Sequence, residues 1–400
     1  GTRLLSLAAA IGIARQCFLN EYSWLETPEE TEALRSISLG TAEAASDDPM
    51  HIAIFAAYRC LGSESTHGPM KGSGPTADLF RQQVLEPAEE RRLIDAIRVR
   101  APAANLTSEA VREQYESNPY PRWTRIGRFE HALPAPAALG ELFPGRNFSG
   151  LPRSGAKVLV AGCGTGRHAI QAALRFADAH VLAFDLSQAS LGYAARKTRE
   201  MGLTNIEYCQ GDILEMEGVT GQFDVVESVG VLHHLEDPVA GWRALLQRLA
   251  PSGVMRIGLY SERARRHVVY GQNFARSLGT SAAPESIRRL RRAIMESSDA
   301  GLQRLTQTED FYTLSGCRDL LLHVQEHRFS PTGLAAMIGA LDLEFLGFEL
   351  ADPAMVTRYR TRFPEDAWLT RLENWEEFER SEPDAFFGMY DFWVRRKTAG

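Results

Sequence analysis

The sequence is poor in cysteine, and the five cysteines that it has are scattered along the chain. Cys17, Cys60, Cys163, Cys209 and Cys317 form no C-x-x-C pair. Their spacing therefore indicates neither a disulfide framework nor a zinc site. An odd, scattered set of thiols is typical of a protein that folds in a reducing compartment, and we expect a cytoplasmic location.

The sequence also lacks a long apolar run and an excess of positive charge. The longest N-terminal apolar stretch, residues 4–13, contains Ser6 and Gly12 and is too short to span a bilayer. It has no signal-peptide layout. The 44 basic and 51 acidic residues give a formal net charge of −7, whereas nucleic-acid binding favours a basic surface. We expect neither membrane nor nucleic acid as a partner. Because the chain begins with Gly1-Thr2, we expect further residues before it in the natural protein.

A glycine-rich turn lies between a predicted strand and a predicted helix. Residues 157–161 form an apolar run typical of a buried parallel strand, and residues 168–174 are typical of a helix. Between them, Gly162, Gly164 and Gly166 allow a tight turn and a close approach of the backbone to a ligand. The helix N-terminus then offers N–H groups to a negative group. The spacing departs from the dinucleotide pattern G-x-G-x-x-G, and the chain has no P-loop sequence.

Two acidic residues follow the turn at positions that suit a nucleotide. Asp185 ends the next predicted strand, about 20 residues after the glycines, where a ribose-binding acid belongs. A helix N-cap is the alternative role, although Ser187 can fill it. Asp212 follows a third predicted strand. Residues 223–238 then predict a fourth strand with its loop, and residues 249–258 predict a helix end, a turn and a fifth strand.

These motifs, in this order, resemble the class I S-adenosylmethionine-dependent methyltransferases, whose first motif is similar to residues 160–166. The resemblance implies an α/β fold with a Rossmann-like seven-stranded sheet. It also implies S-adenosylmethionine as the cofactor and S-adenosylhomocysteine as the product. In the family, the acid that matches Asp212 contacts the adenine amino group, and the apolar residue after it packs on the ring. The cofactor-binding residues implied are Ala161, Gly162, Cys163, Gly164, Gly166, Asp185, Leu186, Asp212, Ile213, Glu227 and Ser228.

The chain is predicted to divide into three parts. Residues 1–105 are predicted to be an all-helical domain, with residues 79–99 helical. Residues 106–150 form a linker or lid. Residues 151–397 form the methyltransferase domain, which contains a helical, substrate-pocket insertion over 262–330 after the fifth strand.

The N-terminal helices, including a helix pair predicted within residues 44–61, resemble the end of a tetratricopeptide-like array, and such helical repeats bind peptides or proteins. A helical cap that packs on the catalytic domain is the alternative. At the other end of the chain, residues 341–350 and 386–395 predict the last two strands. We expect the final strand to be the antiparallel edge partner of the one before it.

Aromatic residues ahead of the catalytic domain are predicted to form a lid. A short helix carries Tyr115 and stops before Pro119, and Tyr120 and Trp123 follow in an extended segment. The string resembles one found ahead of the catalytic domain in a group of bacterial methyltransferases, some of which carry tetratricopeptide repeats. We interpret Tyr115, Tyr120 and Trp123 as a lid over the cofactor or the acceptor. The alternative is that they attach the linker to the domain.

His233 and His234 follow the fourth strand, at the carboxyl edge where open α/β sheets bind ligands. One of them is the predicted catalytic base, because a histidine pKa near ~6.5 suits proton removal from an acceptor. A structural or cofactor-side role is the alternative, since the Leu-His-His string is widespread in relatives with different acceptors. Residues 323–327 also match the H-x-x-E-H zinc motif on a predicted helix, but no third ligand stands out and we expect no metal. Further acceptor contacts are predicted at Tyr260, Tyr312, Arg318, His323 and His327.

The predicted reaction is in-line transfer of a methyl group to an oxygen or nitrogen of a small molecule or peptide. Residues 227–238 are similar to the small-molecule branch of the family. The helical N-terminal region and the acidic charge favour a protein or peptide methyltransferase whose helices dock the target. A non-catalytic nucleotide-binding scaffold is the third alternative, and the intact glycines with Asp185 and Asp212 argue against it.

Overall fold

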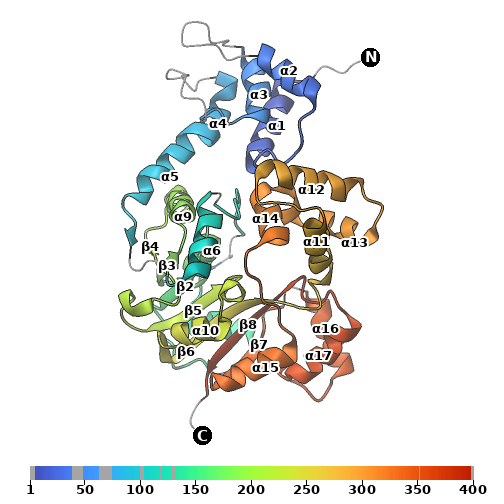
Figure 1. The fold of residues 1–400 in the computed structure, drawn as a ribbon. Coiled ribbons are helices and arrows are strands. Elements are labelled where there is room, and N and C mark those ends of the chain that lie inside the picture. The colour runs from blue at the N-terminus through green and yellow to red at the C-terminus, as the bar shows by residue number, and fades with distance from the viewer. Residues whose placement is uncertain are drawn as a thin grey trace. The chain divides into compact units, whose positions relative to one another are not determined.

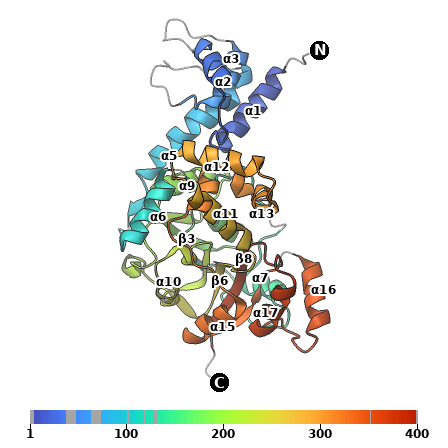
Figure 2. The same ribbon diagram turned by 45° about the vertical axis from the view of Figure 1, so that its right-hand side comes forward.

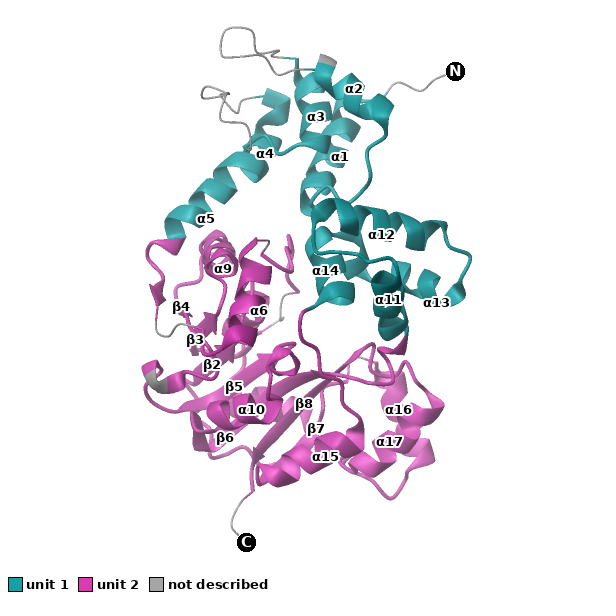
Figure 3. Ribbon diagram, in the orientation of Figure 1, with its two compact units in different colours: residues 1–93, 267–323 teal, residues 94–266, 324–400 magenta. Residues whose placement is uncertain are grey.

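The structure is a computed structural model, which describes residues 5–37, 48–62, 74–99, 103–117, 119–127, 131–350 and 352–397. The chain divides into two compact units, one of residues 1–93 with 267–323 and the other of residues 94–266 with 324–400 (Figure 3). We call them unit 1 and unit 2. In the part of the chain that is described, no helix is both long and apolar enough to cross a membrane.

Unit 2 is built on an eight-stranded sheet with the order β1-β4-β3-β2-β5-β6-β8-β7 (Figure 1). Its strands are β1 (Arg98–Val99), β2 (Lys157–Ala161), β3 (His180–Asp185), β4 (Ile206–Gln210), β5 (Phe223–Val229), β6 (Leu249–Tyr260), β7 (Leu343–Phe348) and β8 (Met389–Arg396). Strands β1 to β6 run parallel, and β8 is antiparallel to both of its neighbours. The parallel strands therefore end at one common edge, where open α/β sheets bind ligands.

The sheet differs from the predicted one in two ways. It has an eighth strand, because Arg98 and Val99 pair with β4 at the edge, whereas residues 79–99 were predicted to be helical throughout. The antiparallel pairing of the last two strands is confirmed, but the edge position predicted for the last strand was wrong. Strand β8 lies between β6 and β7 because Tyr390, Phe392 and Trp393 are fully buried, and a strand buried on both faces belongs inside a sheet.

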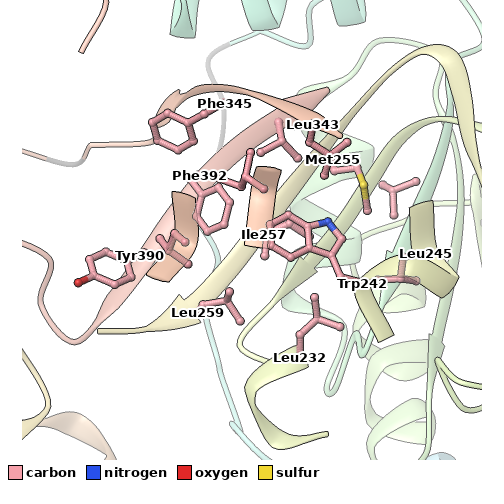
Figure 4. Packing of buried hydrophobic residues seen from close by; sticks show 14 of the residues in the cluster. Leu232, Trp242, Leu245, Met255, Ile257, Leu259, Leu343, Phe345, Tyr390 and Phe392 are labelled. Carbon is pink, nitrogen blue, oxygen red and sulfur yellow. The ribbon is translucent and has the colours of Figure 1, made fainter. Parts of the chain in front are cut away.

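Helices cover both faces of this sheet. The helices of unit 2 are α6 (Leu106–Ser117), α7 (Ala135–Leu142), α8 (Arg167–Arg175), α9 (Gln188–Glu200), α10 (Pro238–Leu246), α15 (Pro331–Ala340), α16 (Pro353–Arg362) and α17 (Leu372–Ser381). On one face, Trp242 of α10 packs with Ile257 and Phe392 of the sheet (Figure 4). On the other face, α7 and α8 cover Val158 and Val225. This double covering explains why the central strands have apolar residues on both sides.

Unit 1 combines the N-terminal helices with the insertion. Its helices are α1 (Leu7–Leu19), α2 (Pro28–Ser36), α3 (Pro49–Tyr58), α4 (Ala77–Phe80), α5 (Glu86–Ile94), α11 (Arg266–Ser277), α12 (Pro284–Glu296), α13 (Ala300–Gln303) and α14 (Leu314–Leu322), of which α5 and α11 reach the unit boundaries. Helix α3 occupies most of the helix pair predicted within residues 44–61, and residues 44–47 lie outside the described part of the chain.

The turn after α1 joins the N-terminal helices to the insertion. The buried guanidinium of Arg291 donates hydrogen bonds to the carbonyl oxygens of Ser23 and Phe311. Arg288 Nε donates to Tyr22 O over 2.7 Å, and Ser315 N donates to a Glu21 carboxylate oxygen over 2.6 Å. These contacts lie within unit 1, which groups residues 267–323 with residues 1–93.

We expect Arg291→Met to lower the free energy of unfolding of unit 1 by about 2 kcal/mol. The substitution leaves two buried carbonyl groups without their donor, at about 1–3 kcal/mol each, and relief of a desolvated charge offsets part of this cost. Hydrogen exchange of the amides in α12 and α14, followed in urea, measures the change. The matched control is Arg292→Met on the same helix, since Arg292 is 57% exposed and, among the residues that the structure describes, pairs with Glu296 in the next turn. Equal effects of the two substitutions would contradict this account.

Candidate active site

The glycine turn after β2 has the backbone conformation that its sequence predicts. Gly162, Gly164 and Gly166 have φ angles of 70°, 50° and 83°, a left-handed region that residues with a Cβ rarely adopt. Added Cβ atoms would lie 2.5 Å from a Val231 methyl carbon at Gly162 and 2.6 Å from Ala194 Cβ at Gly166. Packing therefore requires glycine at both ends of the turn.

The middle glycine is more open. A Cβ on Gly164 would have the Tyr120 carbonyl oxygen, at 3.3 Å, as its only described neighbour within 4 Å. Helix α8 begins directly after Gly166, and no side chain caps its first turn. The N-terminal N–H groups of such a helix favour a negatively charged group. The turn thus has the form of a cradle for a polar ligand.

Asp185, at the carboxyl end of β3, holds this turn. Its Oδ2 accepts the Gly164 N–H over 2.8 Å, and its Oδ1 accepts the Ser187 N–H over 2.9 Å. Ser187 is itself the N-cap of α9, so capping does not account for Asp185. Burial raises the pKa of the Asp185 carboxyl, while the Ser187 and Gly164 N–H groups oppose that rise. The next residue, Leu186, accepts a hydrogen bond from Gln210 through its carbonyl oxygen.

Asp212 and Ile213 follow β4 at the same edge of the sheet. Asp212 is 3% exposed, and its two carboxylate oxygens accept the N–H groups of Leu214 and Ala104, each over 2.9 Å. The segment before α6 therefore reaches Asp212, and α6 itself packs on α9 (Figure 2). Ile213 is 5% exposed and belongs to the core cluster around Trp242.

Two buried polar atoms lie near the end of β5. Glu227 Oε1 and Ser228 Oγ have no hydrogen-bond partner among the described residues, and Ser228 is fully buried. Native proteins leave few buried polar atoms unpaired, and a ligand or water is a common partner. Ser228 thus fits a position that receives a polar ligand.

Glu227 lies beside a network of partly buried charges. Burial raises the pKa of its carboxyl, and Arg256 and Arg175 oppose that rise. Arg256 donates to both carboxylate oxygens of Asp391, over 2.9 and 2.6 Å, and lies 3.4 Å from Glu349. The sequence predicted Glu227 as a cofactor residue but did not reveal these charges, because Arg175, Arg256, Glu349 and Asp391 come from distant parts of the chain.

The two histidines lie in a short 3₁₀ turn over residues 232–234, and both are buried. His234 Nδ1 is 2.7 Å from the carbonyl oxygen of Gln325. Because a carbonyl oxygen only accepts, Nδ1 carries the proton, and Nε2 of the neutral ring carries the lone pair. The His233 ring instead stacks on Tyr260, with ring centroids 3.6 Å apart and planes 24° from parallel. The structure therefore distinguishes the two candidate bases.

The segment before the catalytic domain is fixed on the glycine turn. Trp123 is 6% exposed, and its Nε1 donates to the Thr165 carbonyl oxygen over 3.1 Å. Thr165 Oγ1 donates to the Pro121 carbonyl oxygen over 2.6 Å. Tyr115 and Tyr120 are half-buried and stack on each other, with centroids 6.5 Å apart. These positions suit both predicted roles, a lid from the two tyrosines and an attachment from Trp123.

The remaining predicted acceptor residues are divided between the units. Tyr260 and His327 lie in unit 2, whereas Tyr312, Arg318 and His323 lie in unit 1. Residues 323–327 are not helical as predicted, because α14 ends at Leu322 and His323 is its C-cap. The helical spacing on which the zinc motif depends is therefore missing.

Two residues were not predicted to have a role at this edge of the sheet. Arg265 and Glu326 form a buried ion pair beside the histidines, with 2.9 Å between Nη2 and Oε2. In the sequence, Arg265 was only one of several arginines in a locally basic stretch, and Glu326 was only the acid of the zinc motif. No spacing rule connects two residues 61 positions apart.

The chain is similar to known methyltransferases over its central part. Residues 152–303 match the methyltransferase domain family. The chain is 36% identical over 131 residues to the trans-aconitate 2-methyltransferase of Deinococcus radiodurans, which covers 32% of this chain and 45% of that protein. It is 35% identical over 101 residues to the ubiquinone biosynthesis O-methyltransferase of Acinetobacter baylyi, covering 25% and 42%. An uncharacterised protein of Synechococcus is 31% identical over 210 residues, covering 49% of each chain.

The fold has a counterpart among solved structures. PKMT2 of Rickettsia typhi, solved in complex with AdoHcy, aligns with a TM-score of 0.51 and 15% identity over 70% of this chain and 55% of that chain. The chain thus spans about half the length, or less, of the curated relatives that it matches. The order of motifs, the sheet that carries them and the match over residues 152–303 agree. Residues 152–303 therefore carry a methyltransferase domain, and its fold and order of motifs are those of the class I S-adenosylmethionine-dependent methyltransferases.

Proposed function

We propose that the chain transfers the methyl group of S-adenosylmethionine to an oxygen or nitrogen of an acceptor at the carboxyl edge of β5 and β6. The observation that carries this proposal is the glycine turn, held by the Asp185 carboxylate at the same edge as the histidine pair. Turn, acid and base lie at the ends of β2, β3 and β5, where the sheet binds ligands.

The residues present fit the cofactor. Each carboxylate oxygen of Asp185 accepts one backbone N–H and keeps a further lone pair for a ribose hydroxyl. Gly164 leaves space over the turn, and Ser228 Oγ is buried without a partner among the described residues. Asp212 is the proposed acceptor for the adenine amino group, with Ile213 next to it in the sequence. Ala161 and Cys163 at the end of β2 and Leu186 after β3 are the other proposed cofactor residues.

When bound, S-adenosylmethionine supplies a methyl group on a positively charged sulfur. The residues of this chain bind, orient and remove a proton. Asp185 and the glycine turn hold the donor, and the lone pair on His234 Nε2 takes the proton of the acceptor hydroxyl or ammonium. The Gln325 carbonyl oxygen fixes this tautomer through Nδ1 and stabilises the imidazolium that forms.

The acceptor that we propose is a small molecule. Two relatives with named activities are a trans-aconitate 2-methyltransferase and a ubiquinone biosynthesis O-methyltransferase. The second candidate is a peptide or protein acceptor, which the joining of the insertion and the N-terminal helices in unit 1 favours. We also propose a cytoplasmic location, because all five cysteines are free thiols.

The test is calorimetric titration of S-adenosylmethionine and S-adenosylhomocysteine, followed by labelled methyl transfer to trans-aconitate, catechol and peptides. We expect micromolar binding, and about a 100-fold lower kcat in His234→Gln, because general base catalysis contributes about that much. His180→Gln, at the opposite end of β3 and exposed, is the matched control. Absence of cofactor binding would overturn the proposal, and binding without transfer to any acceptor would favour a scaffold.

A further inference from the structure

Arg265 lies just beyond β6, and its guanidinium covers one face of a tyrosine. The distance from Arg265 Cζ to the Tyr260 ring centroid is 3.6 Å, which is typical of a close cation–π contact. The His233 ring stacks on the same tyrosine, also 3.6 Å from its centroid. Two groups this close cannot share one face of a ring. Tyr260 is therefore held between the Arg265 guanidinium and the His233 imidazole.

The same guanidinium also holds Glu326. Arg265 Nη2 donates to Glu326 Oε2 over 2.9 Å, and Nε donates to Oε1 over 3.4 Å. The side chains of Arg265 and Glu326 are 8% and 5% exposed, so water screens their attraction little. Arg328 donates to the same carboxylate over 2.8 Å. The Arg265–Glu326 pair is bidentate, a geometry that the arginine side chain allows and the lysine side chain does not.

The residues on either side of Glu326 bind the histidine pair. The Gln325 carbonyl oxygen accepts the proton of His234 Nδ1 over 2.7 Å. The His327 N–H donates to the His233 carbonyl oxygen over 2.8 Å. By holding Glu326, the Arg265 side chain thus also fixes the backbone groups of Gln325 and His327 that bind His234 and His233.

We propose that Arg265 is a positioning residue that holds His234 in the tautomer with its lone pair on Nε2. It acts along two routes, through Tyr260 to His233 and through Glu326 to Gln325 and His234. Its contacts with Tyr260 and Glu326 let it act on the base rather than on the acceptor. The inference rests on the proposed role of His234 as the base. It also assigns a purpose to the acid of the H-x-x-E-H string, which binds the positioning arginine.

The chemistry of the two routes requires arginine. A lysine at position 265 keeps the charge and one contact to Glu326, but it cannot stack a planar group on Tyr260 while donating twice to a carboxylate. A methionine keeps part of the stem and removes the charge. We therefore expect Arg265→Met to disturb the His234 tautomer more than Arg265→Lys does. Glu326→Gln should affect only the route through Glu326 to Gln325 and His234.

The test is nitrogen NMR of the full chain with its histidine rings labelled, which reports the protonated nitrogen of each imidazole without any acceptor. His234→Gln assigns the signal. In the unchanged protein we expect Nδ1 of His234 to carry the proton. In Arg265→Lys and Glu326→Gln we expect a mixture of tautomers, while affinity for S-adenosylhomocysteine stays within about twofold. Once an acceptor is known, kcat should fall about tenfold or more with little change in KM for S-adenosylmethionine, because small misplacements of a catalytic group have effects of this size.

The matched control is Arg263→Lys, two residues earlier. Arg263 pairs with Glu376 over 3.2 Å, is 37% exposed and stacks on no ring among the contacts described. An unchanged His234 tautomer in folded Arg265→Lys and Glu326→Gln would overturn the inference. Absence of S-adenosylhomocysteine binding by the unsubstituted protein would instead overturn the proposed function, so the two failures are distinguishable. If Arg265→Met does not fold, Arg265→Lys and Glu326→Gln still test the inference.

Discussion

Asp185→Asn is expected to lower the affinity for S-adenosylmethionine by about 100-fold or more, because a charge-assisted hydrogen bond contributes about 1.5–3 kcal/mol and the two proposed bonds to the ribose hydroxyls are affected. The carboxylate accepts the N–H groups of Gly164 and Ser187 and is proposed to accept the ribose hydroxyls. An asparagine has one accepting oxygen, and its amide group would face a backbone N–H. The ribose contact and the shape of the turn are both lost. Calorimetric titration measures the change.

The control for this substitution is Asp224→Asn, at the amino end of β5. Asp224 Oδ2 accepts the Lys157 N–H over 2.8 Å. Like Asp185, it is a carboxylate that accepts a backbone N–H, but it lies at the opposite edge of the sheet. We expect Asp224→Asn to bind the cofactor within about twofold of the unchanged protein, since it removes no ligand contact. Normal binding by Asp185→Asn would show that the ribose acid lies elsewhere.

Gly166→Ala is expected to lower the free energy of unfolding of unit 2 by about 3 kcal/mol. A left-handed conformation costs an alanine about 1–2 kcal/mol, and overpacking costs about 1–3 kcal/mol. The added Cβ would lie 2.6 Å from Ala194 Cβ and 3.1 Å from Ala194 Cα. Neither atom is the end of a flexible side chain, so α9 or the turn must shift. Urea unfolding, monitored by hydrogen exchange in β2 and β3, measures the loss.

Gly202→Ala separates conformational strain from the clash. Gly202 has a φ of 70°, and a Cβ there would meet nothing within 4 Å. Gly202→Ala should therefore lower the free energy of unfolding only by the cost of the left-handed conformation, about 1 kcal/mol. If Gly166→Ala cost no more than Gly202→Ala, the turn would not pack against α9 as the structure shows.

The central sheet could be predicted because its signals are local. Strands β2, β3 and β5 are largely apolar and are bounded by turn residues. The residue type of Gly162, Gly164 and Gly166 predicts their left-handed conformation. The start of α2 is equally local, because Thr27 Oγ1 accepts the Glu30 N–H and the Glu30 carboxylate accepts the Thr27 N–H. Each of these features depends on residues within a few positions of one another.

Other features depend on pairing between distant segments. Strand β1 has only Arg98 and Val99, too few residues to show a period, and its pairing with β4 overrides the helical pattern before it. The interior position of β8 depends on its pairing with both β6 and β7, which the sequence of β8 alone does not indicate. The helix predicted over residues 323–327 was wrong because α14 ends at Leu322. Local propensity does not register such long-range contacts.

The candidate site shows the same division. Asp185 and the histidine pair were identified from motif positions, whereas Arg265 and Glu326 were not. Their pairing joins the end of β6 to a segment 61 residues later. The tautomer of His234 likewise depends on the Gln325 carbonyl oxygen, 91 residues away. Motif positions thus suggest candidate residues, and contacts between distant segments show how those residues are held.

The bond between Arg291 and Ser23 has a consequence for synthesis on the ribosome. The two residues are 268 positions apart, so Ser23 emerges roughly 10 to 50 s before Arg291 at a translation rate of about 5–20 residues per second. During that interval the turn after α1 has no insertion to bind, and most of the sheet of unit 2 is made first. Unit 1, although it contains the start of the chain, is therefore completed only after the strands from β2 to β6 have left the ribosome.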